Sequence, residues 1–345
     1  MLFQIIQTKK DTGVRKLRKS YGIDIYFQQH WRDDRLKNIV DDMTDNLTIP
    51  EHLIDHIWKP DTFFSNAVDR EKKLQTDRFL RLDRRGKLIF SQKLLLTADC
   101  PMNLKMYPLD QQACKLSISS YGYSVKDVIY RWIPGMIPVD TSAVQSGDLA
   151  EFELEMVRSS YKNETYVSGG VFSGLEVCFQ LQRNAGFYIL HLCIPSAGMV
   201  ISSWVSLWIE KDTQFNDVIT VILSILLLNY AYNSVMPKVS YVKIMDWYLA
   251  ICFLFAFISL AKLVIVKYCR LRMEKMSHQK ASLRREPSSM EELHIEEPPR
   301  AAYRRTYRCM KTFHFMTQTI LPLAFFGSLI AIMGLAPAFY RQDRC

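Results

Sequence analysis

Two closely spaced cysteines are the first residues in the chain whose chemistry points to a function. Cys100 and Cys114 enclose thirteen residues, among them Tyr107-Pro108-Leu109-Asp110. Pro108 fixes its own φ angle and Asp110 can accept hydrogen bonds from nearby backbone, so both turn the chain back on itself. The loop therefore favours a disulfide, which would remove about 3 kcal/mol of unfolded-chain freedom and persists in an oxidising compartment. Two unpaired buried thiols are the alternative.

The residues around this loop have the pattern of an antiparallel sheet protein. Residues 21–183 contain short runs of Val, Ile, Tyr, Phe and Leu that are interrupted by Asp, Pro, Gly and Asn. Such runs predict a β-sandwich, and Asp83-Arg84-Arg85-Gly86 predicts a hairpin between two of them. The sequons at Asn46 and Asn163 agree with an extracellular, glycosylated sandwich.

Four long apolar segments follow the predicted sandwich. They cover residues 187–209, 215–232, 247–266 and 316–340. As helices, each could cross the roughly 30 Å of hydrocarbon in a bilayer, and we expect Pro195 to kink the first. Residues 272–308 are polar and hold Pro287, Pro298 and Pro299, so we expect a flexible connection.

The net charge of +9 could suggest a nucleic-acid-binding protein, but its distribution indicates membrane topology instead. Residues 267–311 hold twelve Lys or Arg against six Glu and adjoin an apolar segment. Positive residues concentrate on the cytoplasmic side of membrane proteins. The sequence has no P-loop, no dinucleotide-binding glycine turn and no HExxH zinc motif. We therefore predict no nucleic-acid partner and no cofactor or metal site. A four-span membrane enzyme would need clustered His or carboxylates at membrane depth, and the apolar segments offer His191 and Asp217 as the candidates, so we predict no enzymatic activity.

The second apolar segment has the polar stripe of a helix that lines water. At helical spacing, one face carries Thr213, Asn216, Thr220, Leu223 and Leu227, so the stripe is polar at one end and apolar midway. Ordinary packing of the two leucines against other helices is the alternative interpretation.

Several stretches of the chain together resemble one family. They are IYFQQHWRD at residues 25–33, IWKPDTFF at 57–64, the Cys100–Cys114 loop, SYGY at 120–123 and PKVSYVK at 237–243. In this order they resemble subunits of the pentameric Cys-loop receptors, on the branch of the GABA type A and glycine receptors. The resemblance implies an extracellular antiparallel β-sandwich followed by a four-helix transmembrane bundle, in a homo- or hetero-pentamer at the plasma membrane, in some cases postsynaptic.

The resemblance also implies positions for the ligand site and for the gate. A small-molecule agonist would lie between two sandwiches, and Leu223 would fall on the leucine whose five copies close the pore by dewetting. Coupling of the sandwich to the pore would involve Tyr107, Pro108, Asp110, Arg183, Pro237 and Lys238. The implied ligand-site residues are Phe63, Tyr121 and Phe172 on the principal side, with Tyr26, Gln28, Ser91 and Lys93 on the complementary side.

The chain departs from its anion-conducting relatives at the inner mouth of the pore. Those relatives carry Pro-Ala-Arg, whereas this chain has Glu210-Lys211-Asp212-Thr213-Gln214. Rings of Glu210 or Asp212 would favour cations electrostatically, and Gln214 is neutral. The whole-chain resemblance favours chloride as the permeant ion, whereas the residues at the inner mouth favour cations. We therefore expect chloride conduction, with a cation channel of the same family and a non-conducting modulatory subunit as alternatives.

The ligand site departs from the family as well. GABA and glycine receptors have an Arg where this chain has Gln28, and a Glu where it has Ser119. A zwitterionic agonist would lose both ionic anchors in a homopentamer, so either another subunit supplies one face or the agonist is an amine, a proton or a metal. Gly174 replaces a cysteine of the second bridge in glycine receptors, so we expect one disulfide, with Cys193, Cys252 and Cys269 as free thiols.

The domain boundaries follow from these assignments. We expect a truncated start relative to the family, with strands recognisable only from about Tyr21. The partners would be an agonist, the permeant ion, four further subunits and lipid. The domains are residues 1–184 for the sandwich, 185–271 for the first three spans, 272–312 for the cytoplasmic loop, and 313–345 for the fourth span and a short tail.

Overall fold

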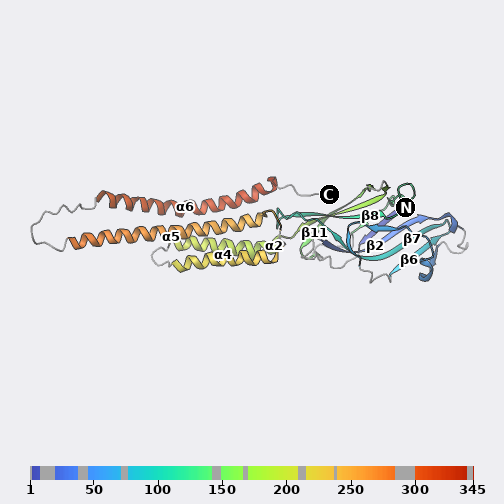
Figure 1. Cartoon of the computed structure of the whole chain (residues 1–345), viewed down its shortest axis with the longest axis horizontal. Coiled ribbons are helices and arrows are strands. Elements are labelled where there is room, and N and C mark those ends of the chain that lie inside the picture. The colour runs from blue at the N-terminus through green and yellow to red at the C-terminus, as the bar shows by residue number, and fades with distance from the viewer. Residues whose placement is uncertain are drawn as a thin grey trace, which may run out of the picture. The chain divides into compact units, whose positions relative to one another are not determined.

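The computed structural model describes residues 2–7, 20–37, 46–70, 77–141, 149–165, 170–208, 215–236, 239–283, 300–339 and 345. The chain forms two compact units, one of strands and one of helices (Figure 1). The strand unit comprises Met1–Leu104, Leu109–Asn184 and Gln342–Cys345. The helical unit comprises Lys105–Pro108 and Ala185–Arg341, so the tip of the Cys100–Cys114 loop belongs with the helices.

Within the described residues, the strand unit contains two main sheets, which are antiparallel except that β1 pairs in parallel with β9 and β10. The larger has the order β10-β1-β2-β7-β6-β3, with β5 also on β7 and β9 on β1; the smaller has the order β11-β14-β8-β4. The short helical turn η1 (Asp34–Leu36) lies between β2 and β3 of the larger sheet, and α1 (Glu51–Ile54) lies between β3 and β4, a strand of the smaller sheet. The larger sheet consists of β1 (Leu2–Gln7), β2 (Ser20–Arg32), β3 (Asn46–Ile49), β5 (Ala67–Arg70), β6 (Arg78–Asp83), β7 (Lys87–Asp99), β9 (Arg131–Trp132) and β10 (Val139–Asp140).

The smaller sheet consists of β4 (Thr62–Phe64), β8 (Gln111–Ser120), β11 (Phe152–Tyr161) and β14 (Gly174–Arg183). A separate hairpin pairs β12 (Glu164–Thr165) with β13 (Val171–Phe172). Side chains of a strand alternate between its two faces, and one set from each sheet builds a shared core. Ile25 and Phe27 of β2 meet Leu116 of β8 and Val177 of β14 in this core.

The predicted hairpin is confirmed by the pairing of β6 with β7. Gly86 has φ of 76°, which glycine adopts without steric cost. A Cβ atom at Gly86 would lie 2.5 Å from the carbonyl oxygen of Asp33, so this turn also needs a residue without a side chain.

The expectation that strands begin only near Tyr21 is wrong. Leu2–Gln7 forms β1, which pairs along its whole length with β2 and also contacts β9 and β10. These six residues alternate too little to predict a strand from sequence. Backbone hydrogen bonds to β2 stabilise β1 instead.

In the part of the helical unit that the structure describes, four helices are long and apolar enough to cross a membrane. The first span begins with α2 (Gly186–Tyr188) and a π-helical turn, η3 (Ile189–Cys193), and continues as α3 (Ile194–Trp208). The other three helices are α4 (Phe215–Val235), α5 (Ile244–Leu283) and α6 (Arg300–Phe339). Side chains of all four pack into one cluster: Val200, Trp204, Ile225, Cys252, Ala256 and Phe325.

The π-helical turn lies just before Pro195, where the predicted irregularity falls. The Ser196 hydroxyl lies 2.7 Å from the Leu192 carbonyl oxygen, and the Tyr248 hydroxyl donates to the Cys193 carbonyl oxygen at 2.7 Å. Pro195 has no N–H to bond the carbonyl four residues earlier, and these two hydroxyls bond carbonyl groups of the same irregular turn.

The expected flexible connection needs correction at both ends. Helix α5 continues to Leu283 and α6 begins at Arg300, so residues 272–283 and 300–308 are helical. Lys, Arg and Gln are polar but good helix formers, as are the apolar Met and Ala, and the three prolines all lie between the two helices.

Candidate functional site

Two aromatic rings of the principal side lie together at the end of the smaller sheet. Phe63 is on β4, opposite Ser119 of β8, and Tyr121 follows the last residue of β8. Their ring centroids are 5.5 Å apart at 85°, an edge-to-face pair. Tyr121 is 79% exposed, so its ring is accessible to a ligand.

A carboxylate that the sequence analysis did not assign holds Tyr121 in place. The Ser120 hydroxyl and the Gly122 backbone N–H donate to the two oxygens of Asp61. These donors come from the residues on either side of Tyr121, so Asp61 fixes the backbone from which the ring projects. Asp61 lies two residues before Phe63, within the quoted IWKPDTFF stretch, and that proximity was the available signal.

The strand that carries Phe63 is anchored by buried hydroxyl groups. The hydroxyl oxygens of Thr62 and Tyr130 are 3.0 Å apart, and Thr62 also donates to the side-chain oxygen of Gln29 at 3.2 Å. Burial raises the pKa of Tyr130 to about 12, so its hydroxyl keeps its proton at neutral pH.

Phe172 comes from the β12-β13 hairpin and is partly exposed. Its neighbour Val171 accepts a hydrogen bond from the Val125 backbone N–H at 2.9 Å. This bond joins the hairpin to the segment that follows Tyr121.

The four residues of the complementary side form one patch on the larger sheet. Strands β2 and β7 place Tyr26 opposite Lys93 and Gln28 opposite Ser91. The Lys93 ammonium lies 5.7 Å from the centre of the Tyr26 ring and 3.5 Å from a carboxylate oxygen of Asp24. Lys93 is therefore the positive charge of this patch, and Gln28 next to it is neutral.

The predicted coupling residues divide between the two units. In the strand unit, Arg183 Nε lies 2.7 Å from Asp110 Oδ1, both side chains are buried, and the Arg183 guanidinium is 4.4 Å from the centre of the Phe152 ring. In the helical unit, the Tyr107 ring lies 5.0 Å from that of Tyr188 and 6.4 Å from that of Tyr232. Pro108 follows Tyr107 through a cis peptide bond. Pro237 and Lys238 lie outside the described residues.

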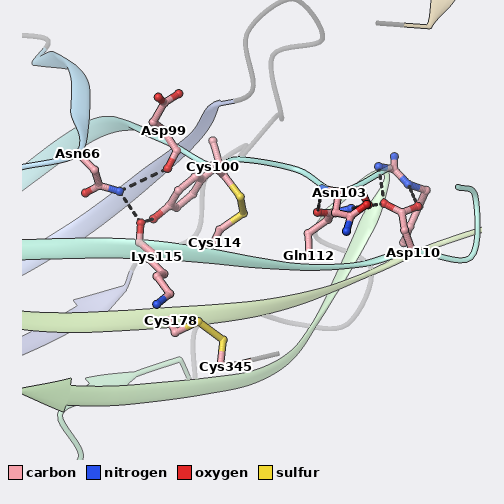
Figure 2. The surroundings of a disulfide bond; sticks show 12 residues. Asn66, Asp99, Cys100, Asn103, Asp110, Gln112, Cys114, Lys115, Cys178 and Cys345 are labelled. Carbon is pink, nitrogen blue, oxygen red and sulfur yellow. Dashed lines mark hydrogen bonds and ion pairs between the residues drawn. A yellow bond between two sulfur atoms is a disulfide. The ribbon is translucent and has the colours of Figure 1, made fainter. Parts of the chain in front are cut away.

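Cys100 and Cys114 form a disulfide, and both are fully buried (Figure 2). The expectation of a single disulfide is wrong, because Cys178 and Cys345 form a second, also drawn in Figure 2. At Gly174 a Cβ would collide with the Lys162 carbonyl oxygen, so that position cannot take a cysteine without rearrangement, and the second disulfide forms elsewhere. The sequence separation of 167 residues between Cys178 and Cys345 gives no local signal for this pairing. Cys193, Cys252 and Cys269 are free thiols, as expected.

On helix α4, the predicted pore stripe and the residues packed against other helices lie on different faces. Asn216, Thr220, Leu223 and Leu227 are all exposed in the single chain, with Leu223 54% exposed and Leu227 61% exposed. Val218 and Ile225 are each 1% exposed. Residues two apart on a helix are about 200° apart around its axis, so Leu223 and Ile225 lie on nearly opposite faces. Thr213 and the selectivity residues Glu210, Asp212 and Gln214 lie outside the described residues.

Comparison with known proteins accounts for both units. The neurotransmitter-gated ion-channel ligand binding domain matches residues 5–185, and the neurotransmitter-gated ion-channel transmembrane region matches residues 192–317. The chain belongs to the neurotransmitter-gated ion channels. It is also 34% identical over 262 residues to the gamma-aminobutyric acid receptor subunit beta-4 of Gallus gallus, a match that covers 74% of this chain and 52% of that protein. The chain thus spans about half the length of this curated relative.

Membership in the neurotransmitter-gated ion channels confirms the predicted fold class. A ligand-binding domain of antiparallel sheets precedes four apolar helices, as in a multi-pass receptor of the plasma membrane. The family consists of ligand-gated channels and not of enzymes. The sequons are placed consistently with this topology, since Asn46 at the start of β3 and Asn163 after β11 are both exposed.

Proposed function

We propose that this chain forms pentamers that open a chloride-conducting pore when a small agonist binds between neighbouring ligand-binding domains. One subunit contributes Phe63, Tyr121 and Phe172, and the next contributes the patch of Tyr26, Gln28, Ser91 and Lys93. The Phe63–Tyr121 pair and its fixation by Asp61 carry this proposal. An exposed ring that is held by hydrogen bonds on both sides has the properties of a binding residue rather than of a core residue.

The charges near these residues restrict the agonist. Ser119 stands where GABA and glycine receptors have a Glu, and it is fully buried, with Gly174 and Phe63 opposite it on the two neighbouring strands. An agonist ammonium would therefore interact with the aromatic rings, which is worth about 0.5 to 2 kcal/mol for each good contact. An agonist carboxylate would need Lys93, which would have to leave Asp24 and the Tyr26 ring. This cost favours an agonist that binds through a cationic group.

Two positions extend the proposal to the pore. Leu223 is the gate, because its side chain projects from the unpacked face of α4 midway along the helix. Chloride selectivity rests on the likeness to the GABA type A and glycine receptor branch, which includes the gamma-aminobutyric acid receptor subunit beta-4.

Whole-cell recording from cells that express only this chain tests the proposal. Amines, zwitterionic amino acids, protons and divalent metal ions are applied in turn, and an agonist should evoke current in the wild type. Tyr121→Ala should weaken the response, whereas Ile137→Ala, a change at another exposed apolar residue of the same domain, should not. An agonist response that is equal in all three proteins would contradict the proposed site.

Cation conduction is the second candidate, favoured by Glu210 and Asp212 at the inner mouth. Five copies of each acid would create a strong negative potential at the inner mouth. This potential would outweigh the positive charge of the cytoplasmic loop, because salt screens charges beyond about 8 Å. In a cation channel, the double variant Glu210→Ala, Asp212→Ala should shift permeability towards anions, and Glu274→Ala on the exposed surface of α5 should not. If no current flows without a related subunit but the chain alters that subunit's response, the chain is modulatory.

A further inference from the structure

The two faces of strand β14 have different neighbours. Leu175, Val177, Phe179 and Leu181 point into the core of the strand unit. The intervening side chains, including Cys178 and Gln180, point to the opposite face because strand residues alternate. Figure 2 shows Cys345 bonded to Cys178 beside this strand.

Two hydrogen bonds hold Cys345 on that face in addition to the disulfide. Its backbone N–H donates to Gln180 Oε1 at 3.2 Å, and its carbonyl oxygen accepts from Arg158 Nη1 at 3.0 Å. Arg158 lies on β11 directly opposite Cys178, so both bonds come from residues next to the disulfide. Three strand residues therefore define a docking position for Cys345.

The docking position of Cys345 links β14 covalently to two membrane spans. Strand β14 ends at Arg183, and α2 begins the first span at Gly186. Helix α6 ends at Phe339, and five residues separate Phe339 from Cys345 in the printed sequence. Strand β14 is thus linked by peptide bonds to the first span and by the Cys178–Cys345 disulfide to the end of the fourth.

The two disulfides differ in exposure. Cys100 and Cys114 are both fully buried, whereas Cys345 is partly exposed and Cys178 is 6% exposed. Access decides which disulfide an external thiol attacks first. Arg158 Nη1 lies 3.0 Å from the Cys345 carbonyl oxygen, so a positive charge lies near the disulfide, and such a charge favours the thiolates that reduction produces.

We propose that the Cys178–Cys345 disulfide is a thiol-sensitive strap that makes the fourth span follow movements of β14, and that extracellular dithiols open it. A dithiol thiolate attacks Cys345 Sγ and Cys178 leaves as a thiolate. The second thiol of the reagent then displaces Cys345 and closes its own disulfide. Two electrons pass from the reagent to the protein, and the Cys100–Cys114 disulfide is left intact.

A nicked receptor tests the covalent part without any current. A protease site is inserted between residues 288 and 289, in the connection between α5 and α6, and the purified full-length receptor is cleaved. The two fragments should migrate together on a non-reducing denaturing gel and separate after a mild dithiol. In Cys345→Ser they should separate without reductant. Wild-type fragments that separate without reductant would overturn the strap.

Recording from the intact receptor tests the functional part, which rests on the proposed function. Brief dithiol treatment should raise the agonist concentration for half-maximal current by at least threefold in the wild type. Cys345→Ser and Cys178→Ser should show the raised value before treatment and no further change after it. An unchanged wild type, or an equal shift in Cys345→Ser, would overturn the strap's role in gating. A receptor that no agonist opens would count against the proposed function, and the gel would still decide whether the strap exists.

Discussion

Asp61 and Gly122 are joined by a hydrogen bond from the Gly122 backbone N–H to the Asp61 carboxylate. The other carboxylate oxygen accepts the Ser120 hydroxyl, so Asp61 holds the chain on both sides of Tyr121. Hydrogen bonds to a charged acceptor are worth roughly 1.5 to 3 kcal/mol. The position of the Tyr121 ring therefore depends on a residue that need not touch the agonist.

Replacing Asp61 should weaken agonist binding through Tyr121. Asp61→Ala removes both acceptors and should raise the agonist concentration for half-maximal current about tenfold, which corresponds to about 1.4 kcal/mol. Asp61→Asn keeps one oxygen acceptor and should have a smaller effect. Surface labelling checks that both variants are delivered. An Asp61→Ala response equal to that of the wild type would show that Asp61 does not contribute to agonist binding.

The aromatic residues should act directly. Tyr121→Ala or Phe172→Ala should raise the required agonist concentration at least about tenfold, because each would lose a cation–π contact of about 1.4 kcal/mol. Tyr121→Phe keeps the ring and should retain most of the response. If neither alanine variant shifts the dose-response curve, the activating site lies elsewhere.

A polar residue at the gate should favour the open pore. Leu223→Ser would wet the constriction, and we expect a lower effective agonist concentration or a standing current. Ile225→Val, a small change on the packed face of α4, is the matched control and should leave gating near that of the wild type. A Leu223→Ser channel with normal gating would show that the register of the pore stripe is wrong.

The buried ion pair should matter far more than an exposed one. Asp110→Asn removes the buried carboxylate nearest to Arg183 and leaves the more distant, exposed Glu151 carboxylate at 3.6 Å. Breaking a buried ion pair costs about 3 to 5 kcal/mol, enough to prevent delivery to the cell surface. At the exposed pair, Lys59 and Arg78 lower the pKa of Asp55 to about 2 through hydrogen bonds, yet Asp55→Asn should leave delivery unchanged. Equal surface labelling of the two variants would contradict this ranking.

Acid should destabilise the ligand-binding domain through His30. Burial, and secondarily the charge of Lys87, lowers the pKa of His30 from 6.5 to about 4. The unfolded chain therefore binds the proton more tightly, and the free energy of unfolding should fall as the pH drops through 6.5 towards 4, by at most about 3 kcal/mol. Thermal unfolding of the solubilised receptor at several pH values measures this loss. His30→Gln should reduce the dependence, and an unaltered slope would assign it to other groups.

The sequence predicts features of this chain that depend on local pattern. Apolar length identified the four spans, alternation identified the sandwich, and spacing identified the Cys100–Cys114 loop. Features set by distant partners were missed. The Cys178–Cys345 disulfide joins residues 167 apart, β1 depends on pairing with β2, and the role of Asp61 depends on a loop some sixty residues away.

The reversal potential of the agonist-evoked current tests the central claim most directly. Cells that express this chain alone are held in high and then in low external chloride, with sodium and potassium constant. We predict that an agonist evokes current in the wild type, that Tyr121→Ala reduces it, and that the reversal potential shifts with the chloride gradient. A reversal potential that ignores chloride and follows the cation gradients would contradict chloride conduction, and the absence of any agonist-evoked current would contradict the channel that we propose.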